Sequence, residues 1–477
     1  MSSAPTSNHP PMDIGLIGLG VMGCNLALNL VEKGWGVAGF DIHTEFSTTC
    51  RQQAIHYPGQ WLPCTDLHQL TTHLKSPRHL LLMIPAGEPV DRMIAQLLPI
   101  LSQGDVVMDC GNSHFADTTR RHRELALHGI HYFGTGISGG ATGARHGPAI
   151  MVGGGPVPDS LWRILETIAA RHQAEPCLHH AGPNGAGHFV KMVHNGIEYA
   201  DMQLLAECQF LMQSLLGLEY SDQAALFETW NQGELSSYLT GITAKIIRNV
   251  DRETGKPALE MIADIANHKG TGQWAAELAL NLGVSTPNLI QAVDARFLSS
   301  FQEARSTLNQ RWPTHPETIA REDRDPLITA LSEALLAARI SVFAQGFHLM
   351  RLAGQRYEWP LDLAAISRCW RGGCILQGVL LESIRDSYTR DPKLDHLFLD
   401  TISGRRVAEG FHHGRSILTR AVSQGIPIPG LLTALSYWDA WRHKPLWTRM
   451  VAAQRDYFGA HGVVRADNNQ RVTWDWS

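Results

Sequence analysis

The chain has 477 residues, with 40 basic and 45 acidic side chains and a formal net charge of −5 at pH 7. Its 44% of hydrophobic and 18% of charged residues are typical of a folded globular protein and exclude an intrinsically disordered one. The length predicts two or three domains. The small acidic surplus gives no reason to expect nucleic acid or an anionic membrane as a partner.

The cysteines and the termini limit the location. The eight cysteines are scattered, with no spacing typical of a zinc site or a disulfide framework, so we expect a reducing cytoplasm. No apolar run approaches the roughly 18 residues that a membrane span needs. Residues 1–12 lack the basic start and apolar core of a secretory signal, and we expect them to form a flexible lead.

The first predicted unit after this lead binds a dinucleotide. An apolar strand precedes Gly18, Gly20 and Gly23, a helical run follows, and a second strand ends at Asp41. Three glycines in this spacing between a strand and a helix, with an acid about 20 residues on, are the fingerprint of a Rossmann βαβ unit. The glycines permit the tight turn, the approach of a pyrophosphate and close helix packing, and the helix N-terminus faces the phosphates. A purely structural turn is the alternative.

The end of the second strand favours NAD over NADP. The Asp41 carboxylate can accept hydrogen bonds from a ribose hydroxyl, but it repels a 2′-phosphate. Neither Ile42 nor His43, which follow, is the arginine expected to bind that phosphate. A protonated His43 is the feature that leaves NADP open.

Later strands of the same unit end in small or turn-forming residues. Because ligands gather at the carboxyl ends of strands in an open α/β sheet, we expect site loops at residues 85–87 and 111–113. The glycine-dense segment at 138–140 offers backbone N–H groups to an anion, although a loop that needs positive φ angles would look the same. The predicted cofactor residues are Gly18, Leu19, Gly20, Val21, Met22, Gly23, Asp41, Ile42, His43, Ile84, Pro85, Ala86 and Asn112.

The second half of the chain is predicted to be helical. After about residue 187, apolar residues recur every three or four positions. We therefore expect an α/β N-terminal Rossmann-type domain over 13–187, followed by a large all-α domain over 188–445. Residues 446–477 are polar, aromatic and irregular, and we expect an extended C-terminal tail that packs onto another surface.

Residues 188–205 concentrate polar groups on one face of a predicted helix. Lys191, His194, Asn195 and Glu198 fall within an arc of about 100°, apart from an apolar stripe. A solvated, charged surface is the plain alternative. Gly196 costs the helix about 1 kcal/mol relative to alanine, which suggests a close approach there. The glycine-rich entry to the helix places this face at a domain junction, where ligand clefts form.

These groups suit the oxidation of an alcohol beside a nicotinamide. A neutral Lys191 can take the hydroxyl proton, and burial near a positively charged ring lowers the pKa of its amine. If the product is a β-keto acid, CO2 leaves readily, and Glu198 can protonate the enol carbon that remains. The Lys191 ammonium can polarise the ketone, so that no metal is needed.

Six segments, in order, resemble those of the 6-phosphogluconate dehydrogenase family. They are "DCGNSHFADTTRR", "GISGGATGARHGPAIM", "VKMVHNGIEYADMQLLAE", "NHKGTGQW", "LDLAAISRCWRGGCI" and "QRDYFGAH". The resemblance runs from about residue 13 to the tail. It implies oxidation of 6-phosphogluconate at C3, loss of CO2 and release of ribulose 5-phosphate, as in the pentose phosphate pathway or gluconate utilisation.

The resemblance also implies roles by position. Lys191 would be the general base and then acid, and Glu198 would protonate C1. The substrate carboxylate and hydroxyls would be held by Asn112, Ser138, Gly139, Gly140, His194 and Asn195. The phosphate would be held by Tyr199, Lys269, Thr271, Arg296 and Arg455. In this family Arg455 and His461 come from the neighbouring subunit, which implies a homodimer with exchanged tails, with pairing into tetramers left open.

The chain departs from the family pattern near the cofactor. Asp41-Ile42 stand where the family commonly has Asn-Arg, which reinforces the prediction of NAD. Pro85 replaces a frequent lysine and removes a cation. Cys110 replaces a usual glycine and Gln273 a usual lysine, with effects that the sequence does not settle.

Two other functions stay open at this point. The first is a dehydrogenase of an unphosphorylated β-hydroxy acid, against which the chain length and the combination of Lys269, Arg296 and Arg455 argue. The second is a non-catalytic NAD-binding dimer, against which the intact pair of Lys191 and Glu198 argues.

Overall fold

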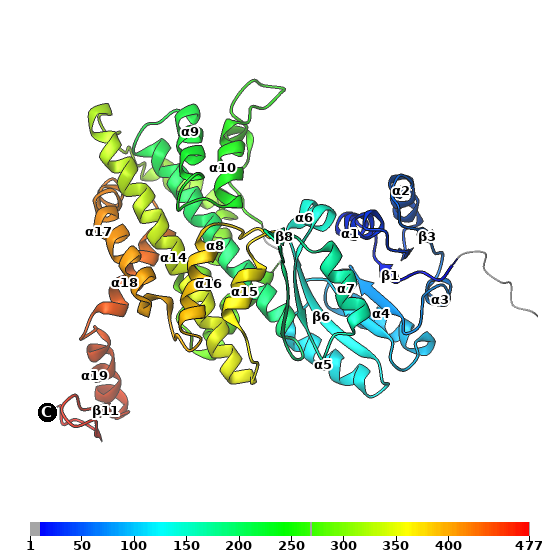
Figure 1. The fold of residues 1–477 in the computed structure, drawn as a ribbon. Helices are drawn as coiled ribbons and strands as arrows, with labels where there is room; N and C mark the ends of the chain where they lie inside the picture. Colours follow the sequence, from blue (N-terminus) through cyan, green and yellow to red (C-terminus); the bar gives the residue numbers. More distant parts are fainter. Residues whose placement is uncertain (1–9, 268–269, 477) are drawn as a thin grey trace, which may run out of the picture.

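The computed structural model describes residues 10–267 and 270–476, and the N-terminal part is built on one large sheet (Figure 1). Its strands are β1 (Ile14–Ile17), β2 (Val37–Phe40), β3 (Trp61–Pro63), β4 (His79–Leu82), β5 (Val106–Asp109), β6 (His131–Ser138), β7 (Ala149–Gly153) and β10 (Leu178–Gly182). They lie in the order β10-β7-β6-β5-β4-β1-β2-β3. Strands β1 to β6 are parallel, and β7 is antiparallel to β6.

The order of the first six strands creates the ligand crevice. The order 3-2-1-4-5-6 is that of a dinucleotide-binding sheet, and its winding direction reverses between β1 and β4. Helices cover both faces, which is why β1, β4 and β5 are buried at every position. The helices are α1 (Val21–Glu32), α2 (Thr44–Ala54), α3 (Leu67–Thr72), α4 (Glu88–Leu97), α5 (Phe115–Ala126), α6 (Gly140–His146) and α7 (Asp159–Ile168), and a small hairpin pairs β8 (Arg171–His172) with β9 (Glu175–Pro176).

The second part is helical, so the predicted fold class is confirmed. Its helices are α8 (Ala186–Ser214), α9 (Tyr220–Trp230), α10 (Tyr238–Arg248), α11 (Thr271–Leu282), α12 (Pro287–Ser299), α13 (Gln302–Arg311), α14 (Arg324–Tyr357), α15 (Leu363–Cys369), α16 (Leu380–Arg390), α17 (Thr401–Ser423) and α18 (Pro429–Arg442). Helix α8 runs from the sheet into the middle of the helical part, as Figure 1 shows. The predicted boundary after residue 187 falls in the first turn of α8.

Glycines let α8 approach the sheet closely. A Cβ on Gly136 of β6 would lie 2.4 Å from the Cβ of Lys191, and a Cβ on Gly187 of α8 would lie 2.3 Å from the carbonyl oxygen of Gly134. Side chains at these positions would push the helix away from the strand. The contact therefore fixes the depth at which α8 lies against the carboxyl-terminal half of β6.

Helix α14 corrects one expectation. By length and composition, residues Arg321–Tyr357 could cross a membrane, with a mean hydropathy of 1.7 over the most apolar window. However, 78% of that window is buried inside the protein. This is the pattern of a core helix, whose apolar surface packs against its neighbours rather than against lipid.

The two chain ends also differ from expectation. Residues 1–9 of the predicted lead lie outside the described residues, but Met12 is buried and its N–H donates to the His73 carbonyl at 2.7 Å. The packed chain thus begins within the predicted lead.

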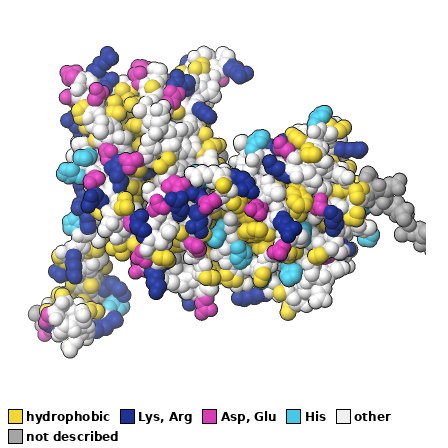
Figure 2. Space-filling model, in the orientation of Figure 1, with side chains coloured by type: hydrophobic (Ala, Val, Ile, Leu, Met, Phe, Trp, Pro, Cys, Tyr) yellow, Lys and Arg dark blue, Asp and Glu magenta, His cyan; other side chains and the backbone are white. Residues whose placement is uncertain are grey.

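The C-terminal tail is not irregular. It forms α19 (Thr448–Gly459) and a hairpin of β11 (Val463–Val464) and β12 (Arg471–Val472). The Asp456 carboxylate holds this unit, because it accepts the N–H groups of Gly462 (2.7 Å) and Trp474 (2.8 Å) and the indole N–H of Trp476 (3.0 Å). Residues 448–476 are called the tail lobe below, and they project from the helical part as a small separate body (Figure 2).

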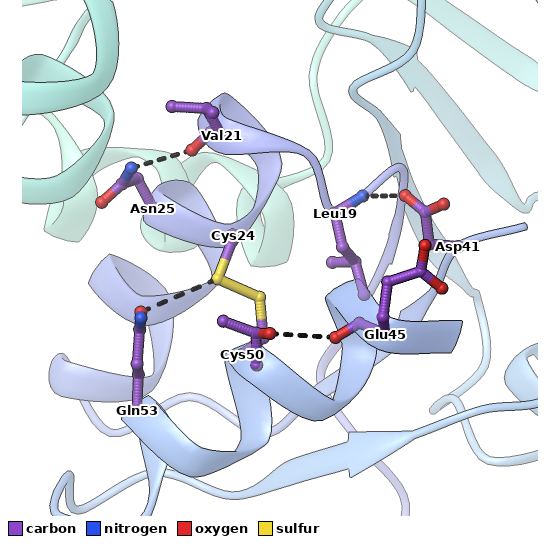
Figure 3. The surroundings of a disulfide bond; sticks show 9 residues. Leu19, Val21, Cys24, Asn25, Asp41, Glu45, Cys50 and Gln53 are labelled. Carbon is purple, nitrogen blue, oxygen red and sulfur yellow. Dashed lines mark hydrogen bonds between the residues drawn. A yellow bond between two sulfur atoms is a disulfide. The ribbon is translucent and has the colours of Figure 1, made fainter. Parts of the chain in front are cut away.

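A disulfide that the sequence did not lead us to expect joins Cys24 of α1 to Cys50 of α2 (Figure 3). The two Cα atoms lie 5.7 Å apart, within the range that a disulfide spans, because α1 and α2 pack side by side. The cysteines are 26 residues apart in the sequence, a spacing that carries no signal. The other six cysteines have buried free thiols.

Candidate active site

Lys191 is the central group of the site. It lies on α8, its side chain is buried, and its Nζ donates a hydrogen bond to Ser138 Oγ at the end of β6, at 3.2 Å. Burial lowers the pKa of this amine, while the nearby Glu198 carboxylate opposes the shift. The amine is therefore easier to deprotonate than a lysine in water, which is what a general base needs.

His194 is held neutral beside Lys191. Its side chain is fully buried, and its Nε2 lies 3.3 Å from the same Ser138 hydroxyl. Burial, and then the charge of Lys191, lowers the pKa of His194 far below its ordinary value. Its Nδ1 lies 3.4 Å from Asn195 Oδ1 and 3.6 Å from Glu198 Oε2. Since the ring is neutral, the second contact is a dipole near a carboxyl group and not an ion pair.

Glu198 is a partly buried carboxyl group with a raised pKa. Burial raises the pKa of Glu198, and the positive charges of Lys191 and Arg296 partly offset this shift. A raised pKa keeps a larger share of the group protonated near neutrality, as a carbon-protonating acid requires. The four polar groups predicted from the spacing thus converge, and the residues of the apolar stripe, Val190, Val193, Ile197, Ala200 and Leu204, are all buried.

The glycine within this helix has a structural cause. A Cβ on Gly196 would lie 2.9 Å from the Cβ of Ala275 and 3.2 Å from a methyl group of Leu289. The close approach suggested by the sequence is therefore made by α11 and α12, and not by a ligand. The same packing brings α11 and α12 to the polar face of α8.

Three of the residues matched to a phosphate site meet at this junction. The Arg296 guanidinium of α12 lies over the Tyr199 ring of α8, with its carbon 3.9 Å from the ring centre. Thr271 is the first residue of α11, and the next residue, Gly272, packs against Tyr199, since a Cβ there would lie 2.6 Å from the ring. Arg296 is buried, and its Nη1 donates to the Ala292 carbonyl at 2.7 Å.

The remaining members of that set are not brought together within one chain. Lys269 lies outside the described residues. Arg455 and His461 are exposed and belong to the tail lobe, which lies beyond α18, away from the junction of α8 and the sheet (Figure 1).

The glycines after β6 take backbone conformations that favour glycine. Gly139 and Gly140 have φ angles of 107° and 60°. A Cβ on Gly139 would lie 2.4 Å from the Gly373 carbonyl oxygen, whereas a Cβ on Gly140 would meet nothing within 4 Å. Gly139 is thus needed for packing, and Gly140 leaves the backbone open next to Ser138.

The glycine fingerprint opens on a cavity of about 570 Å³, within the range of small-molecule sites. Gly18 has a φ of 93°, and a Cβ on Gly23 would lie 1.9 Å from the Gly18 carbonyl oxygen, so both are structural. A Cβ on Gly20 would meet nothing within 4 Å, and α1 has no side-chain cap. Bare backbone and an uncapped helix N-terminus fit a dinucleotide pyrophosphate.

Asp41 faces the same cavity. Its Oδ2 accepts the Leu19 N–H at 2.6 Å, and its Oδ1 accepts the His43 N–H at 2.9 Å. The carboxylate is therefore fixed against the glycine turn by two backbone donors, and each oxygen keeps a further lone pair for a ligand hydroxyl. Ile42 is exposed, as are Val21 and Asn112, whereas Met22, Ile84 and Ala86 are half-buried.

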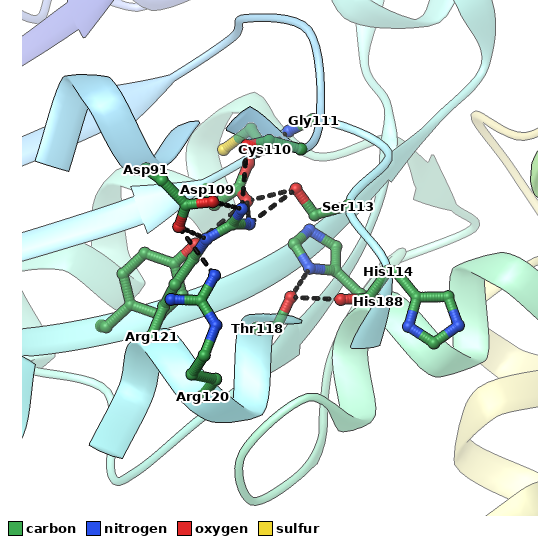
Figure 4. A network of polar contacts seen from close by, with 12 residues as sticks. Asp91, Asp109, Cys110, Gly111, Ser113, His114, Thr118, Arg120, Arg121 and His188 are labelled. Atoms are coloured by element: carbon green, nitrogen blue, oxygen red, sulfur yellow. Dashed lines mark hydrogen bonds and ion pairs between the residues drawn. The ribbon is translucent and has the colours of Figure 1, made fainter. Parts of the chain in front are cut away.

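A buried polar network beneath the loop after β5 escaped the sequence analysis (Figure 4). Asp109 accepts the Gly111 N–H at 3.0 Å, the Ser113 hydroxyl at 2.6 Å and the Tyr132 hydroxyl at 3.0 Å. The fully buried Arg121 lies beside it. The sequence offered only one signal, namely that polar residues follow a strand in a segment resembling a family motif.

Cys374 is a second group that the sequence did not single out. Its buried thiol donates to the Trp370 carbonyl at 3.0 Å and lies near enough to Lys191 for each to influence the other's pKa. Burial raises the pKa of Cys374 to about 12, so this neighbour is a neutral thiol.

Comparisons with known proteins agree with this geometry. Residues 13–182 match the family model of the NAD binding domain of 6-phosphogluconate dehydrogenase, and residues 187–476 match that of its C-terminal domain. Two Bacillus subtilis relatives are the NADP(+)-dependent and the NAD(+)-dependent decarboxylating 6-phosphogluconate dehydrogenases. The first is 41% identical over 97% of this chain and 98% of its own length, and the second is 42% identical over 97% and 99%.

A solved structure is similar along the whole chain. It is the 6-phosphogluconate dehydrogenase of Plasmodium falciparum, determined alone, with NADP+ and with 6-phosphogluconate. The TM-score is 0.94 at 35% identity, and the match covers 97% of this chain and 100% of the other. The family resemblance inferred from the six motifs is thereby confirmed.

The burial of Lys191 predicts a trade between stability and function. Because its pKa is lowered in the native state, the buried charge destabilises the fold at low and neutral pH. As the pH rises from the lowered native pKa towards the ordinary value of 10.5, the native amine is already neutral and this penalty disappears. Lys191→Met should therefore raise the free energy of unfolding by about 1–3 kcal/mol at neutral pH.

Urea unfolding at neutral pH and at the highest pH that the fold tolerates would measure this gain, which should shrink as the pH rises. The exposed Lys33 provides the control, since Lys33→Met should change stability by less than about 0.5 kcal/mol. A loss of stability in Lys191→Met at neutral pH would contradict the conclusion that the buried charge of Lys191 destabilises the fold.

Proposed function

The chain belongs to the 6-phosphogluconate dehydrogenase family, and we propose that it oxidises 6-phosphogluconate at C3, releases CO2 and forms ribulose 5-phosphate, with NAD as the preferred cofactor. The observation that carries this proposal is the buried Lys191 amine, which donates to Ser138 while Glu198 lies on the same face of α8. The names of the relatives agree on the decarboxylating reaction and differ in the cofactor.

In the proposed first step, Lys191 accepts the proton of the C3 hydroxyl. A nicotinamide ring bound at the carboxyl edge of the sheet would supply the acceptor for the hydride that leaves C3. Ser138 and the neutral His194 hold the amine by a chain of contacts of 3.2 and 3.3 Å. Because His194 carries no charge, the protonated Lys191 is the cation that can then polarise the new ketone.

In the second step C1 leaves as CO2, and the enol that remains must be protonated at the former C2, which becomes C1 of ribulose 5-phosphate. Glu198 is suited to this role because burial raises the pKa of its carboxyl group. Lys191 thus accepts a proton in the first step and can return it later, while Glu198 donates a proton to carbon, and both groups lie on one face of α8. Arg296 lies near enough to lower the pKa of Glu198, which links the acid to the phosphate site.

We assign the substrate phosphate to the junction of α8, α11 and α12. Arg296 stacks on Tyr199, which orients its planar guanidinium, and Thr271 presents the first turn of α11. Burial, the largest cause, lowers the pKa of Arg296, so a dianionic ligand would relieve the cost of burying this cation. A site of this kind favours a phosphorylated acid over the unphosphorylated β-hydroxy acid that the sequence left open.

The preference for NAD rests on the charges around the first cavity. Asp41 is fixed there as an acceptor, and an acceptor opposes a 2′-phosphate. Two basic side chains line the cavity, and each lies near a carboxylate: Arg92 is 3.6 Å from Glu88, and His43, which pairs only when protonated, is 3.7 Å from Glu45. A 2′-phosphate would therefore compete with existing pairs, whereas a ribose hydroxyl needs only the Asp41 carboxylate.

We infer a homodimer in which each tail lobe completes the partner's site. Arg455 and His461 match substrate positions, yet they belong to the tail lobe, which lies away from the junction of α8 and the sheet in Figure 1. The tail lobe also exposes the large side chains of Met450, Tyr457 and Phe458. A second copy of the chain is the surface that accounts for both facts. The cytoplasmic location predicted from the sequence stays a prediction.

The reaction can be tested by initial rates on 6-phosphogluconate, gluconate and 3-hydroxyisobutyrate, each with NAD and with NADP, while CO2 is measured. We expect one CO2 per reduced cofactor on 6-phosphogluconate and a higher kcat/KM with NAD. The unphosphorylated acids should lose at least about 100-fold in kcat/KM, because the buried Arg296 would be left without its anion. Equal turnover of an unphosphorylated acid would overturn the proposal.

Cofactor preference should shift when the charges beside the ribose are changed. The double variant Asp41→Asn with Ile42→Arg removes the repelling carboxylate and adds a cation at an exposed position. We expect the ratio of kcat/KM for NADP to that for NAD to rise by roughly 10–100-fold. Ile42→Gln, which adds length without charge, is the control, and an unchanged ratio in the double variant would place discrimination elsewhere.

Exchange of the tail lobes predicts complementation between two inactive variants. Lys191→Met and Arg455→Met should each lose activity as homodimers. After subunit exchange, a mixed dimer has one site with both native residues if Arg455 acts across the interface, and none if it acts within its own chain. We expect mixing to restore up to about one quarter of native activity, from half the dimers with one intact site each. Activity that stays absent in verified mixed dimers would contradict tail exchange.

A further inference from the structure

The buried polar network under the cofactor edge contains a cation that the proposed chemistry does not use. Arg121 lies on α5, and only 1% of its side chain is exposed. Its Nε and Nη2 donate to the two carboxylate oxygens of Asp91 on α4, at 2.8 and 3.0 Å. Its Nη2 also donates to the carbonyl of Gly87, at 2.9 Å. One edge of the guanidinium therefore binds the start of α4 and the loop that precedes it (Figure 4).

The other side of the guanidinium meets the loop between β5 and α5. Arg121 Nη1 lies 3.5 Å from Ser113 Oγ and 3.7 Å from Asp109 Oδ2. The two oxygens of Asp109 bind the residues on either side of Asn112, since Oδ1 accepts the Gly111 N–H and Oδ2 accepts the Ser113 hydroxyl. Asn112 itself is exposed between these two fixed neighbours.

These contacts join the loops that follow β4 and β5, which are neighbours in the sheet on one side of the switch point. We propose that Arg121 is a positioning residue that sets the spacing of the 83–87 and 110–113 loops, and thereby the shape of the nicotinamide end of the cofactor site. A planar group with five donors suits this task, because it holds several acceptors in fixed directions at once. The inference rests on the proposed function for the identity of the ligand between the loops.

Stability alone does not explain this arrangement. Removing a guanidinium and a carboxylate from water is costly, and a well-packed apolar pair often serves a core as well. The chain moreover has a second arginine–aspartate pair between the same strands, at their opposite ends. Arg78 and Asp105 precede β4 and β5, and Arg78 Nη1 lies 2.8 Å from Asp105 Oδ2. That pair joins the strands without touching either cofactor loop.

The network continues towards the helix that carries Lys191. Thr118 lies on α5, one turn before Arg121, and its hydroxyl is 2.7 Å from Nδ1 of the buried His188. His188 lies three residues before Lys191 in the first turn of α8. Helix α5 thus contacts both cofactor loops and the base-bearing helix, which gives Arg121 a fixed frame from which to act.

The test uses the whole protein and the binding of NADH, measured by fluorescence without any substrate. Arg121→Lys keeps the charge but loses the fork, and it should raise the Kd for NADH by roughly 10–100-fold, a loss typical of misplaced site groups. The KM for NAD should rise similarly, while the KM for 6-phosphogluconate changes by less than about threefold. Arg78→Lys is the matched control, and its Kd for NADH should stay within about twofold of the parent.

A Kd for NADH that is unchanged in folded Arg121→Lys, or that moves equally in Arg78→Lys, would overturn the proposal. If Arg121→Lys does not fold, Asp91→Asn replaces it, because Asp91 is partly exposed and provides the α4 side of the grip. We expect a rise of roughly 3–10-fold in its Kd, and no rise would overturn the proposal. Arg120→Gln is its control, since it breaks the exposed Arg120–Asp91 pair and leaves Arg121 intact.

Failure of the proposed function would give a different result. If the chain does not oxidise 6-phosphogluconate but Arg121→Lys still weakens NADH selectively, the positioning role holds and the substrate assignment is wrong. If 6-phosphogluconate is oxidised but the Kd for NADH is the same in Arg121→Lys as in the parent, the substrate assignment holds and the positioning role of Arg121 is wrong.

Discussion

The structure depends on one costly placement, a lysine side chain buried against the end of a β-strand. Lys191 reaches Ser138 because α8 lies directly on β6, and that approach requires Gly136 and Gly187 where the two elements meet. The same burial that lowers the pKa of the amine costs free energy of folding. The surrounding core of apolar side chains from β7, α8, α14 and α15 compensates for that cost.

The two halves of the molecule contribute different kinds of groups. At its carboxyl edge the sheet offers mainly backbone and small side chains, as at Gly20, Ser138 and Gly140, and this suits the binding of phosphate and carboxylate groups. The helices offer the groups that titrate or carry charge, with Lys191 and Glu198 on α8 and Arg296 on α12. The positions of Lys191 and Glu198 relative to the sheet therefore depend on the orientation of α8, which packs against both halves.

Local patterns in the sequence were enough to predict much of this arrangement. The glycine fingerprint and the acid after it predicted a Rossmann sheet, because the turn between β1 and α1 imposes those residues on any chain. The period of the polar and apolar residues in α8 predicted one functional face, since it follows from helix geometry alone. Both predictions concern neighbours within about 30 residues of each other.

Long-range contacts explain what the sequence did not predict. Gly196 lies where α11 and α12 cross α8, and the disulfide joins Cys24 to Cys50 where α1 and α2 pack together. The glycine itself suggested a close approach at Gly196, but residue spacing indicated neither the helices that make it nor the pairing of the two cysteines. Asp41 was predicted to bind a ribose, and the structure adds that the Leu19 and His43 N–H groups already hold its oxygens. The role of Arg121 was also not predicted, because its partners Ser113 and Gly87 lie in loops 8 and 34 residues away in the sequence.

The tail lobe has a well-defined local fold, yet many of its large side chains are exposed. Asp456 binds three donors and gives the lobe a defined fold, although its sequence looked irregular. Yet Tyr457 and Phe458, which follow Asp456 directly, are 72% and 73% exposed. A segment that is ordered by a buried carboxylate while it exposes adjacent aromatic rings fits the proposal that these rings contact another surface. Arg455, on the other side of Asp456, is presented by the same frame. The hydrogen bonds that shape the lobe thus also fix the positions of these side chains before any contact is made, and in the proposed dimer this would reduce the entropy lost on association.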